Sequence, residues 1–310
     1  MNESFVNQIR NNIQGKILQA EPLHQHTWYR IGGPCDLYCI PQSIPDVHTL
    51  VQMCRDANIP FFVLGKGSNL LVSDEGLRGV VLNLSSCCLD LEFNGNQLHV
   101  GAGWYMPKLV LECEKRGLGG IERFAGIPGT VGGALKMNAG CHGREMYDVV
   151  HDVTFLQNGE TQIAVKNELE VEYRHVRTFD DASTVILSST WTMTPESPDR
   201  LSEARKQYMK KRQETQPINL PSSGSVFRNP SGDHAARLIE TAGLKGHSVG
   251  GAAISDKHAN FIVNVNRATA NDVLELMKKA RHEVFEKFGV LLELEVKLVG
   301  FETDEISELV

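Results

Sequence analysis

The distribution of apolar and polar positions predicts a strand, a helix and a second strand near the start of the chain. In the helix, expected within residues 43–60, four apolar residues share one face. They are Val47, Leu50, Val51 and Cys54. Ser43 is a natural N-cap, and Pro45 suits the first turn. The flanking strands are expected at residues 35–42 and, as a buried run, at residues 61–65.

Similar patterns predict the elements that follow. Strands are expected at residues 79–84 and 97–103, a helix at 106–117 that stops at Gly117, and short strands to about residue 193. The polar segment 194–200 contains two prolines and marks a domain boundary.

Beyond that boundary, helices are expected at residues 201–214, which are basic, and at 234–243. A long helix begins at Thr269 and ends before Gly289, because its apolar residues form one stripe. The stripe consists of Val273, Met277, Ala280, Val284 and Phe288. A closing strand is expected at residues 290–299. There Leu292, Leu294, Val296 and Leu298 would share one face, with Glu293, Glu295 and Lys297 on the other.

These elements predict an α+β fold with a two-lobed N-terminal unit and a smaller C-terminal domain. We place the two N-terminal subdomains at residues 1–78 and 79–195, and the C-terminal domain at residues 196–310. A chain of 310 residues exceeds the usual size of a single core, so several domains are expected.

Composition narrows the class of protein. Apolar residues make up 41% and charged residues 22%, which is typical of a folded protein. The net charge of −7 argues against a general nucleic-acid binder. No segment has the pattern of a signal peptide or a membrane span. The seven cysteines lack metal-ligand spacing, so we expect buried free thiols, no metal site and a reduced, cytoplasmic protein.

Two glycine-rich segments carry the strongest chemical signal. In the first, LGKGSNLLV at residues 64–72, Gly65 and Gly67 allow backbone N–H groups to approach an anion. Ser68 and Asn69 could add side-chain donors. The segment matches neither the Walker loop nor the dinucleotide fingerprint, and a plain tight turn is the alternative interpretation.

The second segment, AGIPGTVGGALKMNAGCHG at residues 125–143, contains six glycines among nineteen residues. So much uncovered backbone suits a flat, polar ligand with several rings, although a set of turns would also explain it. Together the two segments indicate a large dinucleotide cofactor such as a flavin.

Six motifs make the chain similar to a known family. They are TWYRIGG (27–33), LGKGSNLLV, GIPGTVGGALKMNAG, YR (173–174), GSVFRNP (224–230) and ELEVKLVG (293–300). In this order they resemble UDP-N-acetylenolpyruvoylglucosamine reductase, in its shorter class without the tyrosine-loop insertion. The resemblance runs from about residue 20 to residue 301.

The resemblance implies a two-subdomain FAD-binding fold of the vanillyl-alcohol-oxidase (PCMH) type and a C-terminal substrate domain. FAD should be bound non-covalently, because residues 64–72 contain no histidine. Lys136 departs from the uncharged residue expected there. The cofactor-binding residues implied are Arg30, Gly65, Gly67, Ser68, Asn69, Gly126, Ile127, Pro128, Gly129, Thr130, Gly133, Asn138, Ala139 and Gly140.

The implied reaction transfers hydride from NADPH to FAD and then to the enolpyruvyl group of UDP-N-acetylglucosamine enolpyruvate. By resemblance, Arg174 and Glu295 stabilise the substrate carboxylate, and Glu295 would need a raised pKa to donate a hydrogen bond. Ser225 is the implied general acid: even an alcohol can protonate a strongly basic carbon. From pattern alone, these residues could instead be a surface arginine, a solvent-facing glutamate and a turn-capping serine.

For the sugar nucleotide, the expected contacts are Arg212, Gln216 and Asn229. His258 and Asn260 could be substrate contacts or buried polar residues, and the sequence does not decide between them. We expect a monomer without nucleic-acid or membrane partners. Two other functions stay open: a flavin oxidase or dehydrogenase of the same fold, and a sugar-nucleotide binder or phosphotransferase without redox chemistry.

Overall fold

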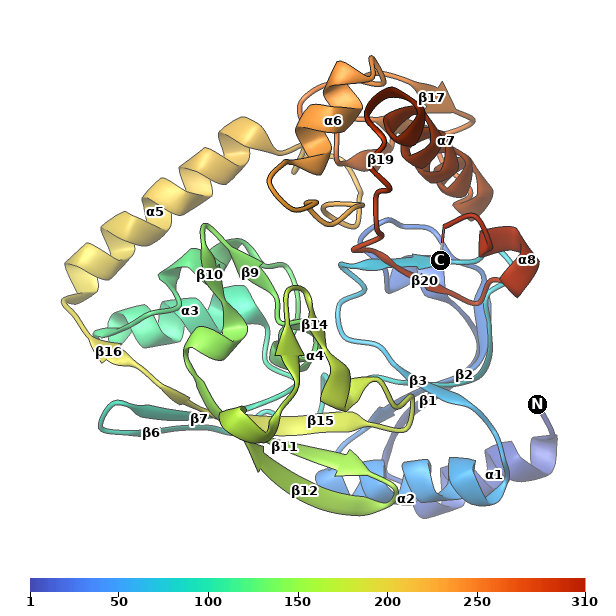
Figure 1. Ribbon diagram of the computed structural model, residues 1–310. Coiled ribbons are helices and arrows are strands. Elements are labelled where there is room, and N and C mark those ends of the chain that lie inside the picture. Colours follow the sequence, from blue (N-terminus) through green and yellow to red (C-terminus); the bar gives the residue numbers. More distant parts are fainter. Residues whose placement is uncertain (310) are drawn as a thin grey trace. The chain divides into compact units, whose positions relative to one another are not determined.

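The computed structural model describes residues 1–309 of the chain, which form two compact units. Two short stretches, 21–35 and 67–78, fold with the C-terminal residues rather than with their sequence neighbours. The first unit therefore comprises residues 1–20, 36–66 and 79–211, and the second comprises these two stretches and the residues from 212 onward. Figure 1 shows the elements of both units. The three-domain division given above stays a prediction.

A four-stranded sheet and two helices begin the first unit. They are α1 (Glu3–Asn12), β1 (Gly15–Pro22), β2 (Pro34–Pro41), α2 (Ile44–Asp56), β3 (Phe61–Val63) and β5 (Leu77–Leu82), with the strand order β1-β2-β5-β3. As predicted, Ser43 caps α2 and accepts a hydrogen bond from the backbone N–H of Asp46 at 3.2 Å. β3 is half-buried rather than buried, because it lies at the edge of the sheet, parallel to β5.

An antiparallel five-stranded sheet forms the rest of this core, with two helices beside it. The elements are β6 (Leu91–Asn94), β7 (Gln97–Gly101), α3 (Met106–Lys115), α4 (Val131–Lys136), β11 (Val150–Gln157), β12 (Glu160–Val165) and β15 (Val185–Thr192). The strand order is β12-β11-β15-β7-β6. The helix α4 was not expected inside a glycine-rich segment. It forms because Val131, Ala134 and Leu135 place one apolar face against β7 and β15.

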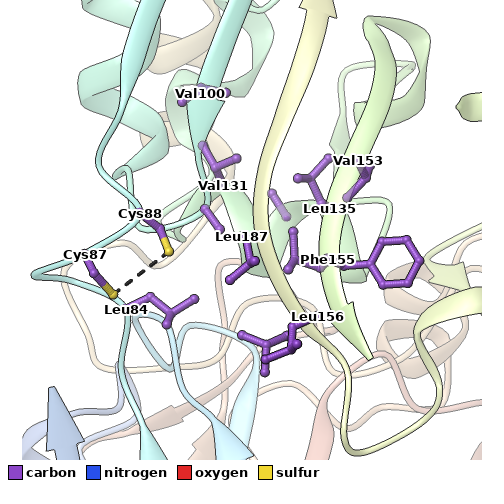
Figure 2. Packing of buried hydrophobic residues seen from close by; sticks show 14 of the residues in the cluster. Leu84, Cys87, Cys88, Val100, Val131, Leu135, Val153, Phe155, Leu156 and Leu187 are labelled. Atoms are coloured by element: carbon purple, nitrogen blue, oxygen red, sulfur yellow. Dashed lines mark hydrogen bonds between the residues drawn. The ribbon is translucent and has the colours of Figure 1, made fainter. Parts of the chain in front are cut away.

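Figure 2 shows the apolar packing around α4. Val131 and Leu135 of this helix lie beside Leu187 of β15, and the same cluster contains Val153 and Phe155 of β11. The core of the first unit continues from here to the four-stranded sheet through buried residues such as those of β5.

Short strand pairs and a long helix complete the first unit. The pairs are β8 (Leu118–Gly119) with β16 (Thr194–Pro195), β9 (Gly140–Cys141) with β10 (Arg144–Glu145), and β13 (Val171–Glu172) with β14 (His175–Val176). Short 3-10 helices of this unit cover Glu122–Gly126, Met146–Asp148, Lys166–Glu168 and Arg177–Phe179, and another, Leu23–Gln25, belongs to the second unit. The predicted basic helix is α5 (Pro198–Thr215), which begins within the proline-containing segment.

The second unit has its own apolar core. Its elements are β4 (Leu70–Val72), α6 (Ala235–Thr241), β17 (Ser248–Val249), β18 (Ala252–Ile254), β19 (Ile262–Asn264), α7 (Ala270–Phe288), β20 (Lys297–Val299) and α8 (Thr303–Ile306). β17, β18 and β19 form an antiparallel sheet, and β20 pairs with β4 in parallel. The predicted ends of α7 are confirmed: Thr269 forms a capping box with Asp272, and Gly289 ends the helix at φ +65°.

The predicted strand at residues 290–299 is wrong over most of its length. Only β20, its last three residues, is a strand, and Leu294 forms an isolated bridge with Phe227. The N–H groups of Glu295 and Val296 both donate to the carbonyl of Val226, at 2.8 and 3.3 Å. Two successive donors on one acceptor interrupt the alternation of a strand. Glu295 is consequently half-buried, whereas Glu293 is exposed.

All seven cysteines are free, and all but Cys141 are buried, as predicted from their spacing. Within residues 1–309, no helix has both the length and the apolar character that crossing a membrane requires.

Candidate functional site

The second glycine-rich segment lines a pocket in the first unit together with the start of the first segment, Leu64 and Gly65. Leu64 and Gly65 follow β3, and the pocket also includes the turn after β5 and the residues after β7. Among the residues that line it are Gly65, Asn83, Leu84, Gly103, Thr130, Gly132 and Gly133. The structure thus brings together two segments that are more than sixty residues apart in the sequence.

Several of these glycines leave no room for a side chain. A Cβ atom on Gly65 would lie 2.6 Å from Oγ1 of Thr130, and a Cβ on Gly132 would lie 2.9 Å from Cβ of Ala102. At these positions the pocket wall is bare backbone, which a flat, polar, multi-ring ligand can approach closely. These residues fit FAD.

Hydrogen bonds among the residues that line the pocket hold this wall in place. Thr130 caps α4 and accepts from the N–H of Gly133 at 3.3 Å. The amide of Asn83, from the turn after β5, donates to the carbonyls of Leu64 and Gly65 at 2.9 and 3.2 Å. The first glycine loop is thereby fixed at the position where it meets the second.

Arg174 lies at the tip of the β13–β14 hairpin and contacts the second glycine segment. Its guanidinium donates to the carbonyl of Gly140 at 2.8 Å and to the carboxylate of Glu145 at 3.1 Å. Its backbone has φ +58°, a left-handed conformation that costs energy for a residue other than glycine and often marks a functional site. With 15% of the side chain exposed, Arg174 is not the surface arginine of the alternative interpretation.

Asn138 connects this hairpin to the glycine segment. The residue is buried, and its amide donates to Glu145 at 2.7 Å and to the carbonyl of Glu172 at 2.9 Å. Its side-chain oxygen accepts from the N–H of Tyr147 at 3.4 Å. These bonds use both amide hydrogens, so the side chain of Asn138 positions the hairpin that carries Arg174.

In the second unit, Ser225 and Glu295 are held next to each other by their backbones. Glu295 donates to the carbonyl of Val226, the residue after Ser225, and Arg228 donates to the carbonyl of Glu293, both at 2.8 Å. Both Ser225 and Glu295 are half-buried. Two motifs separated by about seventy residues thus form one local structure.

Asn260 fixes the loop that carries Ser225. Its side-chain oxygen accepts from the N–H of Phe227 at 2.9 Å, and its amide donates to the carbonyl of Phe227 at 2.8 Å. Its own carbonyl accepts from the N–H of Val226 at 2.9 Å. On the Glu295 side, the amide of Asn69 donates to the carbonyl of Glu295 at 2.9 Å. The buried Asn260 therefore holds the backbone that follows Ser225, and the half-buried Asn69 holds the backbone of Glu295.

Comparison with known proteins gives the family. Residues 216–299 match the model of the UDP-N-acetylenolpyruvoylglucosamine reductase C-terminal domain, and residues 35–165 match an FAD binding domain. A UDP-N-acetylenolpyruvoylglucosamine reductase of Symbiobacterium thermophilum is 44% identical over 92% of this chain and 93% of its own. The chain belongs to this family. A reductase of Bacillus velezensis with the same name is 38% identical over 96% of this chain and 99% of its own.

Among solved structures, the reductase of Thermus caldophilus matches with a TM-score of 0.79 and 33% identity. The match covers 93% of this chain and 99% of the other. The predicted α+β fold, an FAD-binding region followed by the C-terminal domain of the reductase family, is thus confirmed.

The remaining site residues predicted from the family motifs differ in their exposure and in their contacts. Gly67, at φ +59°, packs against backbone: a Cβ there would lie 2.5 Å from the carbonyl oxygen of His26. Asn229 is exposed and accepts from the N–H of Ala235 at the start of α6. Arg212 lies in the last turn of α5, where its carbonyl accepts from the N–H of Gln216. Arg30 is exposed and has φ +56°.

Apart from Ser68 of the first glycine-rich segment, the other predicted cofactor contacts follow the second segment into β9. Those that are half-buried are Ser68, Gly126, Ile127, Pro128, Ala139 and Gly140, whereas Gly129 is buried. Lys136, the departure from the family pattern, donates from Nζ to the carbonyl of Phe179 at 2.8 Å. The ammonium group of Lys136 is therefore bound by a backbone carbonyl of the same unit, next to the pocket that Lys136 lines.

Two residues of this arrangement could not be assigned from the sequence. Glu145 bonds both Arg174 and Asn138, but a single glutamate in GREMYD carries no recognisable signal. For Asn260, the sequence allows either a substrate contact or a buried polar residue. Its burial and its bonds to Phe227 support the second interpretation.

The pocket geometry predicts that Gly65→Ala weakens FAD binding. The new methyl group would displace Thr130, which caps α4 and whose Oγ1 lies only 2.6 Å from where that methyl carbon would be. We expect the Kd for FAD, measured by flavin fluorescence, to rise about tenfold, which corresponds to a loss of roughly 1.4 kcal/mol in binding free energy. The control is Gly95→Ala, in the β6–β7 turn outside the pocket: its backbone at φ +59° strains an alanine, but the new Cβ meets nothing within 4 Å, so FAD affinity should be unchanged. Equal FAD affinity in both variants would contradict the proposed pocket.

Proposed function

We propose that this chain reduces UDP-N-acetylglucosamine enolpyruvate to UDP-N-acetylmuramate, with NADPH as the source of hydride. The chain is an FAD-dependent oxidoreductase of the reductase family. The observation that best supports the proposed roles is the hydrogen bond from the N–H of Glu295 to the carbonyl of Val226, the residue that follows Ser225. It places a proton donor and a carboxyl group in one local structure, as protonation of a carbon next to a carboxylate requires.

FAD would be held by the bare backbone around Gly65, Thr130 and Gly132. When bound, FAD supplies two-electron chemistry, accepting a hydride from NADPH and delivering one to the enolpyruvyl group. The neighbouring apolar residues of the wall, such as Leu84, exclude water from the pocket.

The chain's own polar groups act on the substrate. Arg174, oriented by Glu145 and Gly140, offers a planar fork that matches a carboxylate. Negative charge develops at the carbon that bears this carboxylate, and it is stabilised by the guanidinium of Arg174 and by Glu295 acting as a protonated hydrogen-bond donor. The hydroxyl of Ser225 then donates its proton to that carbon. A base to activate Ser225 is not needed, because the residue gives up its proton to a strongly basic site rather than attacking as a nucleophile.

The proposal is tested by observing the two half-reactions separately, without oxygen. Purified protein loaded with FAD should lose its yellow colour when NADPH is added and regain it when the enolpyruvyl sugar follows. A protein that binds no FAD would exclude both redox functions. A reduced protein that reoxidises with oxygen but not with the sugar would support an oxidase or dehydrogenase instead.

A monomeric state and a location in the cytoplasm stay predictions. Light scattering coupled to size-exclusion chromatography tests the first: a monomer should have the mass of one chain, 34.3 kDa.

A further inference from the structure

Two adjacent cysteines, Cys87 and Cys88, lie in the turn between β5 and β6. Both side chains are buried, with 5% and 4% exposed, although the flanking residues Ser86 and Leu89 are exposed. Their Sγ atoms are 3.9 Å apart and share a hydrogen bond (Figure 2). Cys88 has a left-handed backbone, at φ +53°. The turn thus brings two thiols together just beneath the surface.

We propose that Cys87 and Cys88 form a redox modification site, at which hydrogen peroxide converts the two thiols into a disulfide that small thiols reduce again. Peroxide is little larger than water, so it can reach a pair that lies one residue from exposed positions. The proposed function does not enter this step, which requires only the two thiols and the peroxide.

The surroundings of the two sulfurs differ from those of the other buried cysteines. The Cys88 thiol donates a hydrogen bond to Cys87, which lowers the pKa of Cys87 and raises that of Cys88. Burial without such a donor raises the pKa values of Cys54 and Cys113 to about 12. Because the thiolate is the reactive form, Cys87 is the first thiol to react.

The reaction balances in two steps. The Cys87 thiolate attacks one peroxide oxygen, so that an S–O bond forms, the O–O bond breaks and hydroxide leaves. This hydroxide takes up the proton that Cys87 released on ionising. The Cys88 sulfur then attacks the Cys87 sulfur, and its proton leaves with the hydroxyl group as water. Overall, two thiols become one disulfide, and one hydrogen peroxide becomes two waters.

Oxidation should also alter the FAD pocket. The Sγ atoms must approach from 3.9 Å to about 2.0 Å, which shifts the turn. The carbonyl of Cys88 accepts from the N–H of Gly103 at 3.0 Å, and that of Leu84 accepts from Cys87 at 3.2 Å. Gly103 and Leu84 both line the pocket. The turn packs tightly against Gly101, since a Cβ atom there would lie only 1.9 Å from the Cys88 oxygen. A shift of the turn should therefore also displace the residues that it contacts.

The adjacent positions of the cysteines explain why the bond should be reversible. Consecutive Cα atoms lie about 3.8 Å apart, below the range of about 4.4–6.8 Å that suits an unstrained disulfide. Strained disulfides are the more easily reduced ones.

The experiment treats the FAD-loaded wild-type protein with hydrogen peroxide, blocks free thiols with iodoacetamide after unfolding, and digests it with trypsin without reduction. Cleavage after Arg78 and Lys108 gives a peptide, 79–108, with Cys87 and Cys88 as its cysteines. We expect this peptide to lose two hydrogens and to take up no iodoacetamide. Dithiothreitol should restore double alkylation. Cys113, buried and not adjacent to another cysteine in the sequence, is the internal control and should stay alkylatable.

Full alkylation of peptide 79–108 after peroxide treatment would overturn the proposal, as would oxidation only to sulfinic or sulfonic acid. Because the mass is measured on wild-type protein, the test does not depend on the folding of a variant or on activity with the enolpyruvyl sugar. Flavin fluorescence then tests the coupling. Peroxide should raise the Kd for FAD about tenfold in the wild type and leave it unchanged in Cys87→Ala, whereas an equal rise in both would contradict the coupling.

Discussion

Ser225→Ala is expected to slow reoxidation of the reduced enzyme by the enolpyruvyl sugar about 10²- to 10⁴-fold, the usual contribution of a general acid. Reduction of bound FAD by NADPH should stay nearly unchanged, because that half-reaction needs no proton from Ser225. The two half-reactions are separated by anaerobic stopped-flow absorbance, with NADPH in the first mixing step and the sugar in the second.

Ser222→Ala is the matched control for this prediction. Ser222 belongs to the same loop and is also half-buried, but we assign it no role in proton transfer. Both half-reactions should proceed in Ser222→Ala at wild-type rates. If Ser225→Ala slowed the two half-reactions equally, Ser225 would be acting on FAD binding or folding rather than as the acid.

The helices were largely predictable from the sequence, because local signals specify their ends. The N-cap Ser43, the capping-box residue Thr269 and the terminal glycine Gly289 act through bonds to residues within a few positions. Such bonds involve only residues close in the sequence, so the sequence shows where they form. By contrast, α1 was missed, because only Phe5, Val6 and Ile9 are buried along an otherwise polar segment.

The failures concern partners that are distant in the sequence. The alternating pattern of residues 290–299 is that of a strand, but the backbone donors of Glu295 and Val296 meet a single carbonyl, that of Val226. Nothing within residues 290–299 specifies that carbonyl. The same holds for the pocket, where the need for a glycine at position 65 comes from Thr130, a residue of another segment.

The candidate site was predicted through family motifs, and its supporting residues were not. Motifs identify Arg174, Ser225 and Glu295 by their neighbours in the sequence. Glu145 and Asn260 have no such context, because what they do depends on which side chain or backbone the fold brings next to them.

Asn260→Ala is expected to lower the free energy of unfolding by about 2 to 6 kcal/mol. The reason is that the N–H and C=O of Phe227 both lose their partner in a buried position, and each unsatisfied group costs about 1 to 3 kcal/mol. Urea denaturation gives the change directly. Asn271→Ala, on the exposed first turn of α7, is the control and should stay within about 0.5 kcal/mol of the wild type.

The same substitution tests whether Asn260 positions Ser225 or contacts substrate. If Asn260 positions the loop, its loss allows the loop that carries Ser225 to move. Reoxidation by the sugar should then be slower at saturating sugar concentration, although the decrease should be smaller than in Ser225→Ala. A substrate contact would instead raise the sugar concentration needed for half-saturation and leave the saturated rate unchanged. Because Asn260 is 3% exposed and its side chain bonds both polar groups of Phe227, we expect the first result. A purely affinity-based defect with unchanged stability would show that the bonds to Phe227 do not hold the loop.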